Sequence, residues 1–317
     1  MKKILIALIL ILATFSANAQ KKDKNAIAPM IPYDSLSNFL GEAVASYTGQ
    51  ELFLKALPLS SQELGYPGFI LKYKNDNDLL NDEKNIYKCC DGYNSRYIDL
   101  AGKHFHVIEV IKHPKAKKNE EEYKDEFYLK LNETSSGDQL YYKYNTDSEY
   151  TFPFVVMGYY EKQKQLYTGK EYIFANEIVS GLKDIATGKA IPAVIGQKWK
   201  CTDLIIDKRT GEMRLIIENP KKQKSQIPFE EIIDNAEVKK VYTAAEAASY
   251  TKKFNSYNFN RILQRKIRAG MTTEMCRMAW GNPIDIKETG SGGNKTTTWI
   301  YPSGTISFRN NKAVKIN

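Results

Sequence analysis

The chain contains three histidines, and His104 and His106 have a spacing that could hold a metal ion. Side chains two residues apart on a strand project from the same face, about 6–7 Å apart. Such a pair binds zinc when carboxylates complete the site. Phe105 and Val107 alternate with the histidines and would take the core face. The pattern favours exposed histidines, with a zinc site as the alternative, and we assign neither a metal nor another cofactor.

The motifs of hydrolases and phosphate-binding enzymes are incomplete in this sequence. A hydrolytic triad needs a nucleophile, a histidine and an acid that converge in space, but neither G-x-S-x-G nor H-E-x-x-H occurs. S-x-x-K occurs at residues 180–183 and 249–252, without the S-D-N and K-T-G motifs that accompany it in penicillin-binding enzymes. The glycine-rich stretch 290–293 lacks the Gly-Lys-Ser/Thr ending of a phosphate loop. We therefore predict that the protein is not an enzyme.

Four cysteines, Cys89, Cys90, Cys201 and Cys276, could form disulfides in an exported protein. A bridge between the neighbours Cys89 and Cys90 would be strained, and the other two lie in segments that we assign to different domains. Neither C-x-x-C nor a zinc spacing occurs. Free, buried thiols are the favoured expectation, and a bridge from Cys89 or Cys90 to Cys201 is the alternative.

The N-terminus has the three parts of a secretory signal peptide. Residues 1–3 carry positive charge, residues 4–15 are almost wholly apolar, and residues 16–19 place small side chains in an A-x-A arrangement. The apolar run is shorter than the roughly 20 residues that a spanning helix needs. We predict cleavage between Ala19 and Gln20. Because the residue directly after that point is Gln20 and not a cysteine, we expect a periplasmic or secreted protein without a lipid anchor.

Composition is that of a folded chain with a modest positive charge. Hydrophobic residues make up 42% of the sequence and aromatic residues 12%. Cleavage removes two lysines, which lowers Lys+Arg from 46 to 44, and against 37 acids the net charge becomes 44 − 37 = +7. The lysine run at 112–118 is followed at once by the acidic residues 120–122. We therefore expect no nucleic-acid partner and at most a peripheral association with membranes.

The hydrophobic pattern changes twice along the chain. A short helix capped at Asp34 and Ser35 is expected through about Ser46, strand-like runs follow, and helical spacing returns near Thr243. Among the strand-like runs, residues 199–206 and 212–218 are expected to form a hairpin whose loop ends in Gly211. The predicted fold class is α+β, with antiparallel β-rich modules followed by a small two-helix, three-strand domain. The predicted division is a signal peptide at 1–19, a flexible leader at 20–33, a β-rich domain with an N-terminal helix at 34–165, a second β-rich module at 166–242, and the α+β domain at 243–317.

A short phrase recurs in the strand-rich region. It has five positions. The first is variable, the second is Gly, the third is Lys or Gln, the fourth is variable, and the fifth is a bulky apolar or aromatic residue. The glycine would supply a positive φ before a strand begins, and uneven spacing argues against a solenoid. We interpret the phrase as the first turn of two to four antiparallel modules, with coincidence as the alternative. Its glycines are Gly49, Gly102, Gly169, Gly188 and Gly196.

Tyrosine is unusually frequent, with 21 copies that are densest between Tyr141 and Tyr172. An apolar ring with a polar hydroxyl suits half-buried positions in a sheet. The same side chain also builds surfaces that bind sugars or proteins. Structural use in the sheets is the favoured interpretation, and a binding face is the alternative.

The C-terminal segment has clear helix and turn signals. One helix is expected at residues 244–253 and a second from about Phe259 to Arg268. Gly270 is expected at the break between this second helix and the next, where a side chain would clash or force a strained φ. Thr272 is placed to cap a helix over residues 273–280, and Gly281 ends that helix. Three short strands should follow, at residues 296–301, 305–309 and 313–316, with Trp299 inside the strand layer.

This segment resembles the BamE (SmpA/OmlA) domain family. The matching residues are IRAGMTTEM at 267–275, WGNP at 280–283, TWIY at 298–301, and ISFRNNKAV at 306–314. The resemblance implies a two-helix, three-strand domain of an envelope protein that binds other proteins. Family members assist outer-membrane assembly, usually as lipoproteins. This chain instead lacks the lipidation cysteine and carries a long segment in front of the domain.

Together these features predict an exported, non-enzymatic envelope protein that acts as a protein-binding or scaffolding module. Its partners would be other envelope proteins, and the sequence leaves the oligomeric state open. The alternative is a secreted protein that binds a glycan or another small polar ligand through its tyrosine-rich sheet.

Overall fold

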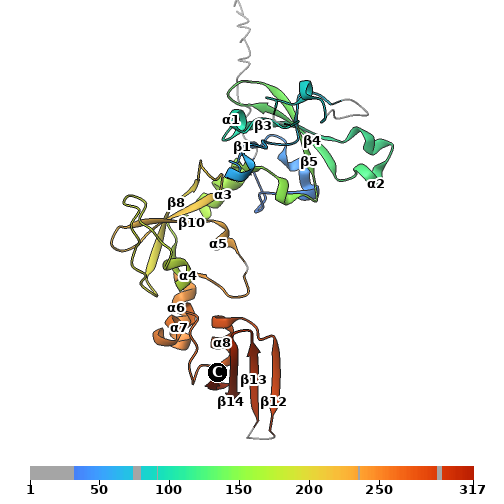
Figure 1. The fold of residues 1–317 in the computed structure, drawn as a ribbon. Coiled ribbons are helices and arrows are strands. Elements are labelled where there is room, and N and C mark those ends of the chain that lie inside the picture. Colours follow the sequence, from blue (N-terminus) through green and yellow to red (C-terminus); the bar gives the residue numbers. More distant parts are fainter. Residues whose placement is uncertain (1–31, 74–79, 91, 235, 291–294) are drawn as a thin grey trace, which may run out of the picture.

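The computed structural model describes residues 32–73, 80–90, 92–234, 236–290 and 295–317 (Figure 1). It confirms the α+β fold class, because three antiparallel sheets follow one another along the chain with helices between them. The predicted cleavage point between Ala19 and Gln20 lies outside the described residues. Among those residues, no helix is both long and apolar enough to cross a membrane.

The first module, blue to green in Figure 1, is built on a six-stranded sheet with the order β2-β5-β4-β3-β1-β6. In β3 the half-buried His104 and His106 alternate with Phe105 and Val107, which are fully buried. In β1, β2 and β6, by contrast, almost all side chains are buried. The helices of this part are short, and α3 leads to the next module. The bounds are β1 Glu51–Leu54, β2 Phe69–Ile70, β3 His104–Lys112, β4 Glu126–Glu133, β5 Gln139–Asn145, β6 Phe154–Val156, α1 Tyr97–Leu100, α2 Glu120–Tyr123 and α3 Met157–Tyr167.

The helix expected from Asp34 to Ser46 is shorter than predicted. A 3-10 helix covers only Gly41–Tyr47. The Asn38 side chain explains the difference, since its amide donates to the carbonyl of Phe154 at 2.8 Å and accepts from the N–H of Val156 at 2.8 Å. These bonds tie the preceding segment to β6 in a non-helical conformation.

The second module is built on a five-stranded sheet with the order β10-β9-β8-β7-β11. The turn between β8 and β9 closes through a hydrogen bond from Gly211 N–H to the Asp207 carbonyl at 2.7 Å. Its elements are β7 Glu171–Phe174, α4 Asn176–Val179, β8 Lys198–Ile206, β9 Met213–Glu218, β10 Lys224–Pro228, α5 Glu230–Ile233 and β11 Val241–Thr243.

The two modules have the same strand topology. If β1, β3, β4, β5 and β6 are matched with β7, β8, β9, β10 and β11, the two sheets have the same order, apart from the added β2. The residue register matches as well. Leu52 of β1 pairs with Phe105 and Val156, just as Tyr172 of β7 pairs with Trp199 and Thr243. The chain therefore contains one five-stranded arrangement twice.

Local irregularities are repeated along with the topology. The register of β3 against β4 shifts between Val107 and Glu109, and that of β8 against β9 shifts between Cys201 and Asp203, which is the matching position. In both modules an eleven-residue helix begins directly after the last strand, namely α3 after β6 and α6 after β11. Shared bulges and helix starts show that the match extends to backbone detail.

The recurrent glycine phrase marks these shared strand starts. All five of its glycines have a positive φ, and four of them directly precede β1, β3, β7 and β8. The Gly49 N–H donates to the Val107 carbonyl at 2.8 Å, and the Gly169 N–H donates to the Cys201 carbonyl at 2.9 Å. The phrase is thus the local turn of a repeated module.

The modules differ chiefly in the connection between their first two matched strands, which are β1 and β3 in the first module and β7 and β8 in the second. In the second module, residues 175–197 make this connection. In the first module, residues 55–103 make it, and they add β2, α1 and the Cys89–Cys90 pair. We call residues 55–103 the insertion, because the second module completes the same sheet without them.

The two modules share one hydrophobic core cluster. The Tyr160 hydroxyl donates to the Leu204 carbonyl at 2.8 Å. At the β8–β9 turn, a Cβ added to Gly211 would lie 2.5 Å from the backbone nitrogen of Ala56, so the turn packs tightly on the first module. The modules are therefore packed against each other.

The C-terminal domain, orange to red in Figure 1, places three helices beside a sheet with the order β12-β13-β14-β15. The structure adds β12 to the three predicted strands. Helix α7 begins earlier than expected, because Asn255 caps its start by accepting from the Asn258 N–H at 2.9 Å. It also ends earlier, at Leu263. The bounds are α6 Ala244–Phe254, α7 Ser256–Leu263, α8 Thr273–Trp280, β12 Asp285–Thr289, β13 Thr296–Tyr301, β14 Gly304–Arg309 and β15 Lys312–Ile316.

Candidate functional site

The histidines with metal-ligand spacing lie on the face of β3 opposite its buried residues. His104 and His106 are half-buried, and His104 Nδ1 lies 2.6 Å from Glu51 Oε1. In the described parts of the chain, no group of three or more His, Cys, Asp or Glu side chains is placed to hold a metal ion. His104 is thus engaged by a carboxylate on the neighbouring strand.

A polar pocket surrounds this pair. Its volume is about 430 Å³, and Glu51, Lys103, His104, Glu133 and Ser135 contribute to its lining. Ser135 donates hydrogen bonds from its hydroxyl and its backbone N–H to Glu133, and Lys103 Nζ donates to the Ser135 hydroxyl at 2.9 Å. Burial works to raise the pKa of Glu133, but hydrogen bonds from the neighbouring serines and the charge of Lys103 hold that pKa below its usual value.

These contacts give the polar pocket a structural role. The Ser135 hydroxyl donates to Glu133 and accepts from Lys103, so both neighbours hold it within the turn. Glu133 accepts from the turn that follows β4, and Lys103 Nζ lies 3.6 Å from its carboxylate. Together the three side chains hold the β4–β5 turn in place.

The second module supports the same interpretation. At the positions that match Glu51 and His104, it carries Glu171 and Lys198, whose charged groups are 3.1 Å apart. Where the first module has Glu133, the second has Asn219, which accepts from the backbone N–H groups of Lys221 and Gln223 at 2.9 and 3.0 Å. A cross-strand pair and a turn-capping side chain therefore belong to the repeated module.

Most tyrosines of the dense segment are packed inside the protein. The exposed tyrosines among the described residues are Tyr93, Tyr150 and Tyr257, and they belong to different segments of the chain. The buried ones take part in ring contacts and backbone hydrogen bonds, as between Tyr144 and the Gly41 carbonyl at 3.1 Å. The buried tyrosines of the dense segment are Tyr142, Tyr144, Tyr159, Tyr160 and Tyr172.

The four C-terminal residues singled out by the sequence lie around α8 and its sheet. Gly270 has φ +87°, but an added Cβ would meet only Arg268, at 3.9 Å, so its backbone conformation matters and a clash does not arise. Thr272 accepts from the Met275 N–H at 3.3 Å as the N-cap of α8. Gly281 ends α8 with φ +80°, and Trp299 is 4% exposed in β13.

The two edges of this C-terminal sheet differ. Along β15, the segment before α8 covers the edge, since the Gly270 N–H donates to the Ala313 carbonyl and the Ala313 N–H donates to the Met271 carbonyl, both at 2.8 Å. Along β12, which is the other end of the sheet order, no described strand pairs with the outer edge. Among the described residues, the sheet is therefore unpaired along β12.

The open edge carries exposed apolar side chains. All residues of β12 are exposed, and Ile284 and Ile286 are 69% and 49% exposed. Ile286 pairs with Trp299 and so projects from the helix-covered face, where α8 supplies Met275 and Cys276 to the core. The helices cover β13 and β14 but leave β12 bare. We call residues 284–289 the β12 ledge.

Comparison with family models, curated proteins and solved structures found no match to this chain.

Sequence reasoning missed the β12 ledge. The available signal was the pair Ile284 and Ile286, which follows Pro283, is separated by Asp285 and is followed by two further charged residues. Such a pattern is typical of an exposed edge strand, but two apolar residues are too few to distinguish it from a loop.

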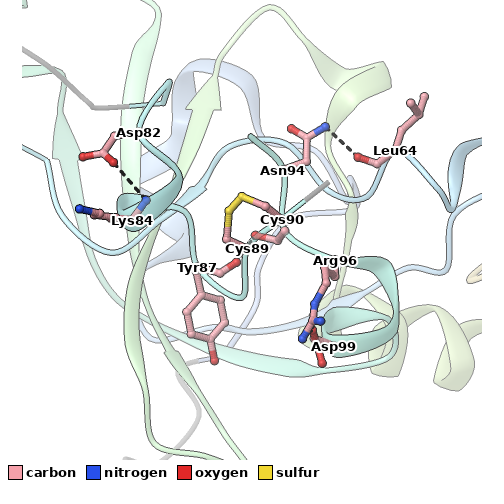
Figure 2. Close-up of a disulfide and its surroundings, with 10 residues drawn as sticks. Leu64, Asp82, Lys84, Tyr87, Cys89, Cys90, Asn94, Arg96 and Asp99 are labelled. Carbon is pink, nitrogen blue, oxygen red and sulfur yellow. Dashed lines mark hydrogen bonds and ion pairs between the residues drawn. A yellow bond between two sulfur atoms is a disulfide. The ribbon is translucent and has the colours of Figure 1, made fainter. Parts of the chain in front are cut away.

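The expectation of free, buried thiols is correct for Cys201 and Cys276 and wrong for Cys89 and Cys90. Cys89 and Cys90 form a disulfide with each other (Figure 2), so they are neither free nor bonded to Cys201. Cys201 lies in the sheet of the second module and Cys276 in α8, and both are buried free thiols. Burial raises the pKa of Cys201 to about 11 and that of Cys276 to about 12. Cys89 and Cys90 belong to the insertion of the first module, away from the core that encloses Cys201.

Proposed function

We propose that this is an exported, non-enzymatic envelope protein that binds a protein partner through the β12 ledge of its BamE-like C-terminal domain. The observation that carries the proposal is the open edge of β12 with Ile284 and Ile286 exposed beside it. The signal peptide predicted at residues 1–19 supports export.

The expected mode of binding is addition of a strand. An edge strand presents unpaired backbone N–H and C=O groups, and an extended peptide satisfies them by hydrogen bonding. Specificity then comes from alternate side chains of the peptide. A partner residue beside Ile286 would meet an apolar surface continuous with the Trp299 core, and a residue on the opposite face would meet Asp285 and Lys287.

The opposite edge of the same sheet supplies a matched control. Val314 of β15 is 50% exposed, nearly the same as Ile286 at 49%. Both are aliphatic side chains on end strands, but the edge of β15 is covered by residues 270–272. A change in binding that is specific to Ile286 would therefore report on the open edge and not on general surface hydrophobicity.

The test uses the full-length exported protein with a photo-crosslinking residue at position 286 or 314. We expect a cross-linked envelope protein from position 286 only. With that partner purified, Ile286→Asp should weaken binding by about tenfold or more, since burying half of an isoleucine contributes on the order of 1 kcal/mol and an introduced charge adds a desolvation cost. Val314→Asp should leave the affinity unchanged. Equal cross-linking from both positions, or equal loss of affinity, would refute the assignment.

A further inference from the structure

The Cys89–Cys90 disulfide lies in the insertion, the part of the first module that the second module lacks. It occupies the loop between Tyr87 and Arg96 (Figure 2). The loop is closed by other contacts, because the Arg96 N–H donates to the Lys88 carbonyl at 3.0 Å and Ser95 pairs with Tyr66 through two backbone hydrogen bonds. Its fold therefore does not depend on the bond between the sulfurs.

The position of the bond argues against a stapling role. A disulfide stabilises a protein mainly by restricting the unfolded chain, and the effect is smallest for the shortest loop. This one joins residues with a sequence separation of 1 and links no two elements of the fold. Tyr87 is instead held by its hydroxyl, which donates to Asp138 Oδ2 at 2.8 Å. The sulfur pair is thus available for chemistry without loss of the framework.

Cys89 and Cys90 are also the more exposed of the four cysteines. Cys89 and Cys90 are half-buried beside the small cluster formed by Ile70, Ile86 and Tyr128. Cys201 and Cys276, by contrast, are fully buried. Thiol–disulfide exchange needs a sulfur that an incoming thiolate can approach, and in the described structure the Cys89–Cys90 pair alone combines a disulfide with partial exposure.

We propose that Cys89–Cys90 is a thiol–disulfide exchange site for thiol substrates. In the first step a thiolate attacks one of the two sulfurs, a new S–S bond forms to the incoming thiol, and the neighbouring cysteine leaves as a thiolate and takes up a proton. In the second step another thiol attacks the mixed disulfide and releases the oxidised substrate disulfide. The balance is two thiols oxidised to one disulfide, with two electrons and two protons transferred to Cys89 and Cys90.

The adjacent cysteine gives this site a distinct kinetic property. Because the released thiol stays one residue away, it can attack the mixed disulfide in the reverse direction without diffusion. The mixed disulfide should therefore be short-lived in the wild type. With one cysteine replaced, the same adduct has no neighbour to resolve it and should accumulate.

The first experiment counts thiols in the full chain, alkylated at the moment of lysis from the exported pool. Under denaturing, non-reducing conditions we expect two alkylated cysteines, Cys201 and Cys276. After native incubation with reduced glutathione we expect all four to be alkylated once the protein is denatured. Four free thiols before any reductant, or a pair that glutathione reduces only after denaturation, would overturn the proposal.

The second experiment uses single variants and oxidised glutathione. Cys90→Ser should accumulate a glutathione adduct on Cys89 to at least tenfold the level seen in the reduced wild type, and Cys201→Ser, as control, should behave as the wild type. Equal adduct levels in Cys90→Ser and the wild type would contradict the exchange mechanism. If Cys90→Ser does not fold, the reduction of the native wild type by glutathione in the first experiment still tests the proposal.

The source of the thiol is tested by a parallel arm with a cysteine-containing unfolded peptide in place of glutathione. Faster reduction by the peptide at equal thiol concentration indicates a polypeptide substrate, and faster reduction by glutathione indicates a small thiol. Either result supports exchange at this site. Reduction by neither reagent overturns it.

Discussion

Replacement of Gly281 by alanine should destabilise the C-terminal domain more than the same change at Gly270. Gly281 has φ +80° and ψ −160°, a region of backbone space that is occupied almost only by glycine. A Cβ there would also lie 3.0 Å from Glu237 Oε1 and 3.1 Å from Val238 Cγ2. Glu237 accepts a hydrogen bond from the Asn282 N–H, which would be displaced.

The two glycines separate backbone strain from steric contact. Gly270 also has a positive φ, of +87°, but its added Cβ would have only Arg268 nearby. Strain alone predicts a loss of about 1 kcal/mol in the free energy of unfolding at Gly270. At Gly281, strain of up to about 2 kcal/mol and a disturbed hydrogen bond of about 1 kcal/mol give roughly 3 kcal/mol.

Denaturant unfolding followed by tryptophan fluorescence measures this difference. Trp280 and Trp299 lie in the C-terminal domain, and Trp199 lies in the second module. A Trp199→Phe background restricts the signal to the domain of interest, and the matching position of the first module is itself a phenylalanine, Phe105. Equal losses at Gly270 and Gly281 would refute the steric argument, and no loss at Gly281 would refute its role in ending α8.

Four further outcomes are expected. Thr272→Ala should lower the stability of the C-terminal domain by about 1 kcal/mol in the same assay, because the N-cap of α8 is lost. The pKa of Glu133 is lowered from 4.5 in the folded state, so its charge stabilises the fold above that pH and the contribution is lost as pH falls through the lowered pKa. The stability gap between wild type and Glu133→Gln in pH-dependent melts should therefore be full at neutral pH and close in acid. N-terminal sequencing of the exported protein should begin at Gln20, and recovery of an intact Met1 would contradict export by cleavage. Melting temperatures with and without a chelator should coincide, and a clear drop with chelator would point back to metal at His104 and His106.

The sequence predicted those parts of the fold that have local signals. The β8–β9 hairpin shows alternating apolar residues around a loop that ends in Gly211, and α8 carries a cap at each end. The glycine phrase located four strand starts, because a positive φ at that position is a local steric requirement. These features depend on a few neighbouring residues, so a single chain reveals them.

Other features depend on contacts that are distant in sequence. The second C-terminal helix was extended to Arg268 in the prediction, but Arg265 adopts φ +57° just after the helix ends. Its conformation is held by an ion pair with Glu177 and by the Trp280 indole, which donates to the Arg265 carbonyl at 2.8 Å. No local propensity marks an arginine for a positive φ, and both partners come from other elements.

The candidate sites were harder to predict than the fold. The β12 ledge buries neither face, so alternation carries little signal there. The Cys89–Cys90 bond was judged unfavourable from spacing alone, whereas the insertion folds into a loop that brings the two sulfurs together. The matching registers of the two modules cannot be found from the sequence alone, because matched positions often carry different residues, as where Leu52 corresponds to Tyr172 and Phe105 to Trp199.

The second module shows how the same sheet forms when a shorter connection takes the place of the insertion. Residues 175–197 bridge the same two strands that residues 55–103 bridge in the first module, and they complete the sheet with far less chain. The longer connection is therefore not needed to join the two strands, although it adds the buried side chains of Tyr66, Phe69 and Leu100 to the core of the first module. Grafting the shorter connection in its place should give a protein with two similar scaffolds and no Cys89–Cys90 pair, in which whatever the insertion does is removed as a unit.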